Sequence, residues 1–221
     1  MKDKNDGREK RLVYADAIAQ TIRTQERPLI TIDGPCASGK TTFAAQLAEQ
    51  LSAAVVHTDD YVIPHAQKTE ERLAAPGGNC DAERLFHEVI QPWKDGLPVR
   101  TRRYDCRRDR LLPEELLPDS SVLIVEGSYC NLPVIRQRAD IRFFLDTPWE
   151  IREKRLRERE SPESLKRFFD RWIPLEDAYF SAFGLPDPGC IVISTHTPAA
   201  ANIPPSRSAP HSHTTDSAVS R

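Results

Sequence analysis

The sequence predicts an α/β fold in which helices cover both faces of a parallel five-stranded sheet. Short apolar runs alternate with segments of helical periodicity, and polar residues follow most of these runs. This alternation is typical of parallel sheets, because the helices supply the crossover connections between strands. The predicted strands cover residues 28–32, 53–57, 121–125, 141–145 and 191–193.

A glycine-rich loop follows the first strand. It reads Gly34-Pro35-Cys36-Ala37-Ser38-Gly39-Lys40-Thr41, which matches the pattern G-x-x-x-x-G-K-T, and Thr42 opens a helix predicted to run through Leu51. In this context the loop amides and the positive end of the helix bind a polyphosphate. Lys40 would reach the β- and γ-phosphates, and the Thr41 hydroxyl would bind Mg²⁺. The segment therefore predicts a P-loop NTPase fold that binds ATP and Mg²⁺ through residues 34–42.

The other segments follow from periodicity and from turn residues. We expect an amphipathic helix over 12–22, a loop over 67–80, a helix over 81–90 and a small hairpin within 97–105. Helices are also predicted over 149–160 and over 165–183, the second with a break at Pro174. The domain organisation expected is a frayed N-terminus over 1–10, one folded domain over 11–196 and a disordered tail over 197–221.

The composition excludes several classes of protein. The net charge of −2 gives no general attraction to nucleic acid or to an anionic membrane. No apolar run is long enough to span a bilayer, and residues 1–11 lack the apolar core of a signal peptide. The five cysteines form no C-x-x-C pair, which favours a reducing compartment. We expect a cytoplasmic protein with no nucleic-acid or membrane partner, and a homo-oligomer stays open.

Carboxylates stand at the ends of two predicted strands. Asp59 and Asp60 follow the second strand, where a carboxylate accepts a proton from an acceptor hydroxyl or holds Mg²⁺ through water. One of the two is expected to cap the following turn, and we favour Asp59 as the base. Glu126 ends the third strand, where it either supports Mg²⁺ through water or points at solvent. These residues follow strand ends, where ligands bind in parallel sheets.

The chain resembles the uridine kinase family of P-loop nucleoside kinases, which includes nicotinamide riboside kinases and is related to phosphoribulokinase and pantothenate kinase. The resemblance extends from about residue 29 to residue 193. It is carried by the phosphate loop, Asp59-Asp60-Tyr61, Tyr104-Asp105, Val125-Glu126-Gly127 and Asp146-Thr147 with the arginines that follow. A weaker similarity places Asp81 on an aspartate that binds ribose hydroxyls in that family, and a plain helix N-cap is the alternative.

The resemblance implies roles for particular residues. Asp59 would be the general base, Glu126 would support Mg²⁺, and the acceptor would contact Asp59, Asp81, Tyr104 and Arg110. Arg155 and Arg159 would belong to an arginine-rich lid over 149–170 that closes over the phosphates, the alternative being a solvated helix with Glu–Arg pairs. The chain departs from the pattern in two places. It lacks the histidine after Tyr104-Asp105, with Arg110 one residue early, and it lacks a glycine loop after the lid arginines.

The sequence therefore predicts a phosphotransferase with an alcohol acceptor. The expected reaction is the transfer of the γ-phosphoryl group of ATP to a hydroxyl of a nucleoside-like small molecule, with Mg²⁺ present. Two alternatives stay open. One is a kinase for another hydroxylated metabolite, such as nicotinamide riboside, a vitamin precursor or a sugar phosphate, and the other is a nucleotide sensor that transfers nothing.

Overall fold

The computed structural model describes residues 18, 20–22 and 24–194. The expected frayed N-terminus, most of the helix expected over 12–22 and the expected disordered tail lie outside these residues. Ile18 is among the described residues and is buried in the core. No helix in the described part of the chain is both long enough and apolar enough to span a membrane.

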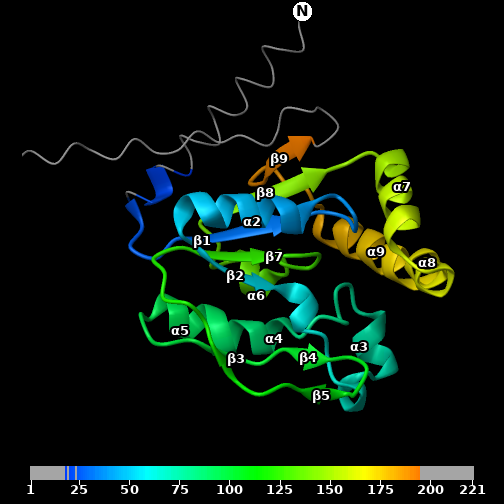
Figure 1. Cartoon of the computed structure of the whole chain (residues 1–221), viewed down its shortest axis with the longest axis horizontal. Coiled ribbons are helices and arrows are strands. Elements are labelled where there is room, and N and C mark those ends of the chain that lie inside the picture. The colour runs from blue at the N-terminus through cyan, green and yellow to red at the C-terminus, as the bar shows by residue number, and fades with distance from the viewer. Residues whose placement is uncertain (1–17, 19, 23, 195–221) are drawn as a thin grey trace, which may run out of the picture.

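A five-stranded sheet forms the centre of the molecule (Figure 1). Its strands are β1 (Leu29–Asp33), β2 (Ala54–His57), β7 (Leu123–Glu126), β8 (Ile141–Asp146) and β9 (Ile191–Ser194). All neighbouring pairs are parallel, and the order is β2-β7-β1-β8-β9. The predicted parallel five-stranded sheet is confirmed, with β1 at its centre, so the loop that follows β1 lies between the ends of β7 and β8.

Helices cover both faces of the sheet, as the sequence predicted. Successive strand residues point to opposite faces, so Leu29 belongs to one core and Ile30 to the other. The Ile30 core packs beneath α2 (Lys40–Leu51), and the Leu29 core packs against α4 (Ala82–Leu85), α5 (Gln91–Lys94) and α9 (Ile173–Phe183). The strands consist almost entirely of apolar residues because both faces of the sheet are buried.

The region after β2 contains more structure than the sequence indicated. The expected loop over 67–80 includes a short helix, α3 (Glu70–Ala74), preceded by a 3₁₀ turn at His65–Gln67. The helix expected over 81–90 begins at α4, continues through a π turn at Phe86–Ile90 and ends with α5. Thr69 and Asp81 cap α3 and α4 by accepting backbone N–H groups.

Two small antiparallel ribbons replace the hairpin expected within 97–105. Strand β3 (Arg100–Thr101) pairs with β6 (Glu115–Leu116), and β4 (Tyr104–Asp105) pairs with β5 (Arg110–Leu111). A turn at residues 106–109 connects β4 to β5, and Asp109 in this turn has a positive φ of 50°. The hairpin is therefore centred later in the chain than its apolar pattern suggested.

The segment after β8 forms the side of the molecule next to the sheet's carboxyl edge (Figure 1). It consists of α7 (Trp149–Arg159), α8 (Pro162–Arg167), a π turn at Phe168–Trp172 and α9. A separate short helix, α6 (Pro133–Arg136), lies before β8, in the connection from β7. The break expected at Pro174 does not occur. Pro174 lies in the first turn of α9, where a missing N–H is tolerated, and the π turn before it keeps the helical path continuous.

Candidate active site

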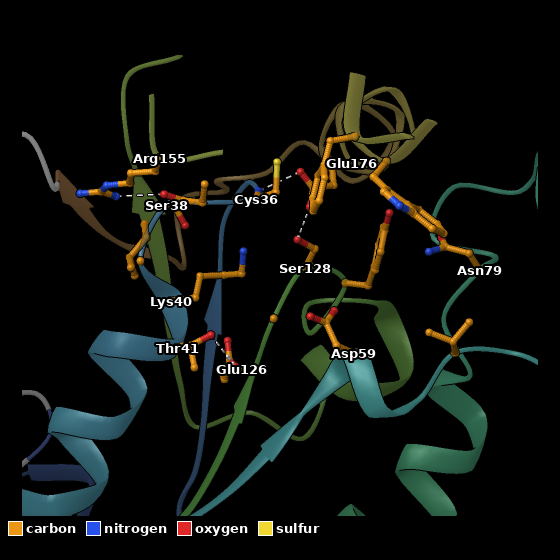
Figure 2. A pocket seen from close by; sticks show the side chains of 18 of the residues that line it. Cys36, Ser38, Lys40, Thr41, Asp59, Asn79, Glu126, Ser128, Arg155 and Glu176 are labelled. Atoms are coloured by element: carbon orange, nitrogen blue, oxygen red, sulfur yellow. Dashed lines mark hydrogen bonds between the residues drawn. The ribbon is translucent and has the colours of Figure 1, made fainter. Parts of the chain in front are cut away.

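A cavity of about 980 Å³ lies at the carboxyl ends of β1, β2 and β7. This is the edge at which parallel sheets bind ligands, and the volume suits a nucleotide with a small second molecule. Figure 2 shows Lys40 and Thr41 on one side of the cavity and Asp59 and Asn79 on the other. Its lining includes residues 36–43, Asp59, Asn79, Glu126, Ser128, Tyr129, Arg155, Arg159, Trp172 and Glu176.

The phosphate loop owes its shape to close packing against β8. Gly34 adopts a φ of +140°, and a Cβ built on it would lie 2.6 Å from the carbonyl oxygen of Leu145. Gly39, with a φ of +99°, precedes α2, and Ala37 has a φ of 59°. Only a residue without a side chain fits at Gly34, so this glycine fixes the path of the loop at the end of β1.

The loop presents donors that suit an anion. The Lys40 ammonium donates to the carbonyl oxygens of Gly34 (2.8 Å) and Pro35 (3.0 Å) and is nearly buried. Within the described residues, no side chain caps the start of α2, and the buried Ser38 hydroxyl has no hydrogen-bond partner. Uncapped helix amides, a lysine and an orphaned hydroxyl fit the phosphates of a nucleotide.

Thr41 and Glu126 lie together, as a magnesium site requires. The Thr41 hydroxyl donates to Glu126 Oε1 over 3.0 Å, and the same oxygen lies 2.5 Å from His57 Nδ1. This hydrogen bond to Glu126 raises the pKa of His57, and nearby aspartates contribute to the same shift. Hydroxyl and carboxylate oxygens are ligands that Mg²⁺ prefers, so the donor set fits that ion.

The sequence analysis did not identify His57 as part of this site. His57 is the last residue of β2 and lies opposite Glu126 in the parallel register of β2 and β7. The signal that could have found it is its position, because residues that end adjacent parallel strands face the same edge.

Asp59 lines the cavity, whereas Asp60 does not. Both belong to a 3₁₀ turn, Thr58–Asp60, directly after β2. The backbone carbonyl of Asp60 accepts a hydrogen bond from Arg84, and burial raises the pKa of its carboxyl group. Of the two carboxylates, Asp59 is the one that an acceptor molecule in the cavity would meet.

Two further carboxylates are buried next to the loop, and the sequence analysis missed both. Asp33, the last residue of β1, accepts hydrogen bonds from the Tyr179 hydroxyl (2.7 Å) and the Gly34 N–H (2.7 Å), and burial raises its pKa to about 6. Glu176 accepts the Cys36 N–H (2.9 Å) and the Ser128 hydroxyl (2.6 Å). An acidic residue one turn before the buried Tyr179 on α9 was the available signal for Glu176.

The arginines of α7 differ in what they contact. Arg155 lines the cavity and donates to the carbonyl oxygen of Ala37 over 2.9 Å. Arg159 also lines the cavity and pairs with Glu160 at 2.7 Å. Arg152 instead donates to the carbonyl oxygen of Thr147, which anchors the base of α7. The structure therefore brings Arg155 to the phosphate loop and Arg159 to the same cavity.

Three predicted acceptor residues do not reach the cavity. Asp81 caps α4, and its two carboxylate oxygens accept from the N–H (3.2 Å) and the Nε (3.0 Å) of Arg84, which fulfils the N-cap alternative. The Tyr104 hydroxyl donates to Asp109 in the adjoining turn. Arg110 is exposed on β5. None of these three residues is part of the cavity lining to which Asp59 belongs.

A comparison with protein families shows to which family the chain belongs. The model of the phosphoribulokinase/uridine kinase family matches residues 29–161, which is more than half of the chain. The chain belongs to the phosphoribulokinase/uridine kinase family. The matched segment begins with β1 and extends just beyond α7, so it contains the phosphate loop, Asp59, Glu126 and both cavity-lining arginines of α7.

Solved structures agree with this assignment of the fold. The structure of a possible uridine kinase from Bacillus stearothermophilus has a TM-score of 0.59 and 25% identity, covering 79% of this chain and 91% of that chain. The structure of YFH7 from Saccharomyces cerevisiae has a TM-score of 0.60 at 10% identity, covering 86% of this chain and 99% of that chain, and shows the fold alone.

Curated relatives match over shorter stretches. A cytidylate kinase of Halobacterium salinarum is 33% identical over 132 residues, which is 60% of this chain and 58% of that protein. A tRNA dimethylallyltransferase of Parasynechococcus marenigrum is 28% identical over 112 residues, 48% of this chain and 34% of that protein. The chain thus spans less than two thirds of the length of these curated relatives.

Proposed function

We propose that this protein is an ATP- and Mg²⁺-dependent kinase that phosphorylates a hydroxyl group of a nucleoside or a similar small molecule. One observation carries the proposal: Asp59 faces the same cavity as the phosphate loop, across from Lys40 (Figure 2). A protein that only senses nucleotides has no need for a carboxylate at that position. Membership of the phosphoribulokinase/uridine kinase family and the similarity to a cytidylate kinase support a phosphotransferase.

The residues have separate tasks in this reaction. The loop amides and Lys40 bind the phosphates, and Thr41 with Glu126 would hold Mg²⁺, which supplies positive charge to the transferring group when bound. Asp59 accepts the proton of the acceptor hydroxyl as that oxygen attacks the γ-phosphorus of ATP, and the bond from that phosphorus to the bridging oxygen breaks to release ADP. Arg155, which contacts the loop, and Arg159, which lines the same cavity, would stabilise the charge that develops on the transferred group and exclude water. The five free cysteines favour a reducing compartment, and we place the protein in the cytoplasm.

The lining of the cavity suggests which acceptor compounds to include in a test. Lys68, Arg167 and Arg171 also line it, which adds cations beyond those next to the phosphate loop. Anionic acceptors, such as sugar phosphates, therefore belong in the panel beside nucleosides, nicotinamide riboside and vitamin precursors.

The test is acceptor-dependent ADP release, measured with the wild type and with Asp59→Asn. The asparagine keeps the size of the side chain but cannot take up a proton, so we expect kcat to fall about 10²–10⁴-fold. ATP binding, followed by the shift in Tm, should persist in the variant. Release that survives Asp59→Asn would remove the base assignment, and ATP binding without release from any acceptor would favour a sensor.

A further inference from the structure

Asp33 is a buried carboxyl group next to the phosphate loop, and the reaction described above does not use it. It is the last residue of β1, and none of its surface is exposed to solvent. Its Oδ1 accepts the N–H of Gly34, the first residue of the loop, over 2.7 Å. Gly34 is packed against Leu145 with no room for a side chain, so the carboxyl group holds a loop amide whose position is fixed.

Neutral donors surround this carboxyl group. Its Oδ2 accepts the Tyr179 hydroxyl over 2.7 Å and the Asn131 N–H over 3.1 Å. These three hydrogen bonds favour the charged form, but burial opposes it more strongly and raises the pKa of Asp33 to about 6. The carboxyl group therefore changes its charge within the pH range in which the protein can be studied.

The contacts of Asp33 allow both charge states. A hydroxyl group can donate or accept, so the oxygen of Tyr179 can accept a hydrogen bond from a protonated Oδ2. That oxygen already accepts the Asn131 N–H over 3.1 Å. The contact with Gly34 involves the other carboxyl oxygen, so the loop keeps its acceptor whether or not Asp33 carries a proton.

Asp33 and a bound polyphosphate would share one cation. The positive charge of Lys40 lowers the pKa of Asp33, and the same ammonium group lies in the phosphate loop, where it donates to the carbonyl oxygen of Gly34. A polyphosphate in the loop brings further negative charge to this place, which disfavours a second anion nearby.

The other titratable groups around Asp33 do not supply a positive charge. Burial raises the pKa of the neighbouring phenols and thiols, which keeps them uncharged up to about pH 8. They belong to the turn after β7, to α9 and to the segment before β9, and are Tyr129, Cys130, Tyr179 and Cys190. Glu176 of α9 is the other carboxylate next to the loop, and it is left unchanged in the variants below.

We propose that Asp33 is a positioning residue of the phosphate loop, and that the loop binds a polyphosphate more tightly when this carboxyl group carries a proton. The inference rests on the proposed nucleotide site and adds a pH dependence to it. A ligand that favours the protonated form takes up a proton as it binds. Its affinity is therefore highest below the pKa of the free protein and falls as the pH rises through about 6.

The experiment is calorimetric titration of ATP into the wild type and Asp33→Asn between pH 5 and pH 8. EDTA is present, so that no metal ion contributes. Asparagine resembles the protonated carboxyl group, since it can accept from Gly34 and donate to the oxygen of Tyr179. We expect equal Kd values at pH 5 and a wild-type Kd about tenfold higher than that of the variant at pH 8, because one pKa unit corresponds to tenfold in affinity.

Repeating the titration in buffers with different heats of ionisation counts the protons that are taken up. Near pH 7 the wild type should take up more protons than Asp33→Asn. The protonation of ATP itself and of His57 is common to both proteins, so it cancels in the comparison. Parallel pH profiles and equal proton uptake in the two proteins would overturn the inference, because a purely structural role changes the affinity equally at every pH.

Tyr179→Phe is the second variant, and it decides the matter if Asp33→Asn does not fold. The phenylalanine keeps the ring but removes a donor that stabilises the charged carboxylate. The pKa of Asp33 should rise, so the pH at which ATP affinity falls should move upward from its wild-type value. An unmoved profile would overturn the inference. A folded wild type that binds no ATP at any pH would instead overturn the proposed nucleotide site, and this inference with it.

Discussion

The carboxylate of Glu176 accepts the backbone N–H of Cys36 over 2.9 Å and so ties α9 to the phosphate loop. Its other oxygen accepts the Ser128 hydroxyl, which lies just after β7 (Figure 2). One buried side chain thus joins the loop after β1, the turn after β7 and the helix that follows the α7–α8 segment. The loop is held in shape before a nucleotide arrives, which reduces the ordering that binding requires.

Replacing Glu176 should weaken nucleotide binding. In Glu176→Ala the buried Cys36 N–H loses its partner, so we expect a loss of about 1–3 kcal/mol in the free energy of unfolding and about tenfold lower ATP affinity. Glu176→Gln is the matched control, because its amide can accept from Cys36 and donate to Ser128. Calorimetric titration with ATP measures the effect, and wild-type affinity in the alanine variant would contradict this role.

Lys40→Ala should remove turnover while the fold is kept. The ammonium donates to the carbonyl oxygens of Gly34 and Pro35, and its removal leaves the rest of the loop's packing unchanged in composition. We expect kcat/KM to fall at least about 10²–10³-fold, since the charge that stabilises the phosphates is lost. ADP release gives the rate and circular dichroism confirms folding. A folded variant with unchanged turnover would refute the assignment of the loop.

Gly34→Ala should destabilise the protein far more than the same change at Gly96. At Gly34 the new Cβ meets the carbonyl oxygen of Leu145 at 2.6 Å, whereas at Gly96, with a φ of +71°, nothing lies within 4 Å. We expect a loss of more than about 3 kcal/mol at Gly34 and about 1 kcal/mol at Gly96, where only the left-handed backbone is strained. Urea unfolding measures both, and equal losses would contradict the packing of the loop on β8.

Tyr179→Phe should destabilise the protein in a pH-dependent way. Burial of the carboxyl group raises the pKa of Asp33 from its ordinary value of 3.8 to about 6. The contribution of Asp33 to stability is therefore fully present below about pH 4 and lost as the pH rises through about 6. The Tyr179 hydroxyl donates to Asp33 and stabilises its charged form.

Removing that hydroxyl should therefore matter most above pH 6. We expect Tyr179→Phe to lower the free energy of unfolding by about 1.5–3 kcal/mol at pH 8, because a hydrogen bond to a charged group is lost. At pH 5 the protonated carboxyl group predominates, and the loss should be smaller. Urea unfolding at the two pH values measures this difference, and equal losses would show that Asp33 is not charged next to Tyr179.

Local sequence determined the fold class and the centre of the site. The apolar runs around Ile30 and Ile124 predicted strands because a strand buried on both faces needs continuous apolar residues. The phosphate loop from Gly34 to Thr41 could be recognised in the sequence because its residues are contiguous and form one short backbone path. Asp59 and Glu126 were found because side chains that follow parallel strands meet at one edge.

Only the tertiary structure decided which other residues complete the site. His57 meets Glu126 across 69 positions of sequence, and Glu176 meets Cys36 across 140. The sequence left Asp81 open between an acceptor contact and a helix N-cap, and the structure shows the cap, with the Arg84 N–H as its donor and the side chain outside the cavity lining. Periodicity and motifs report local backbone preferences, whereas these contacts arise from the packing of distant elements.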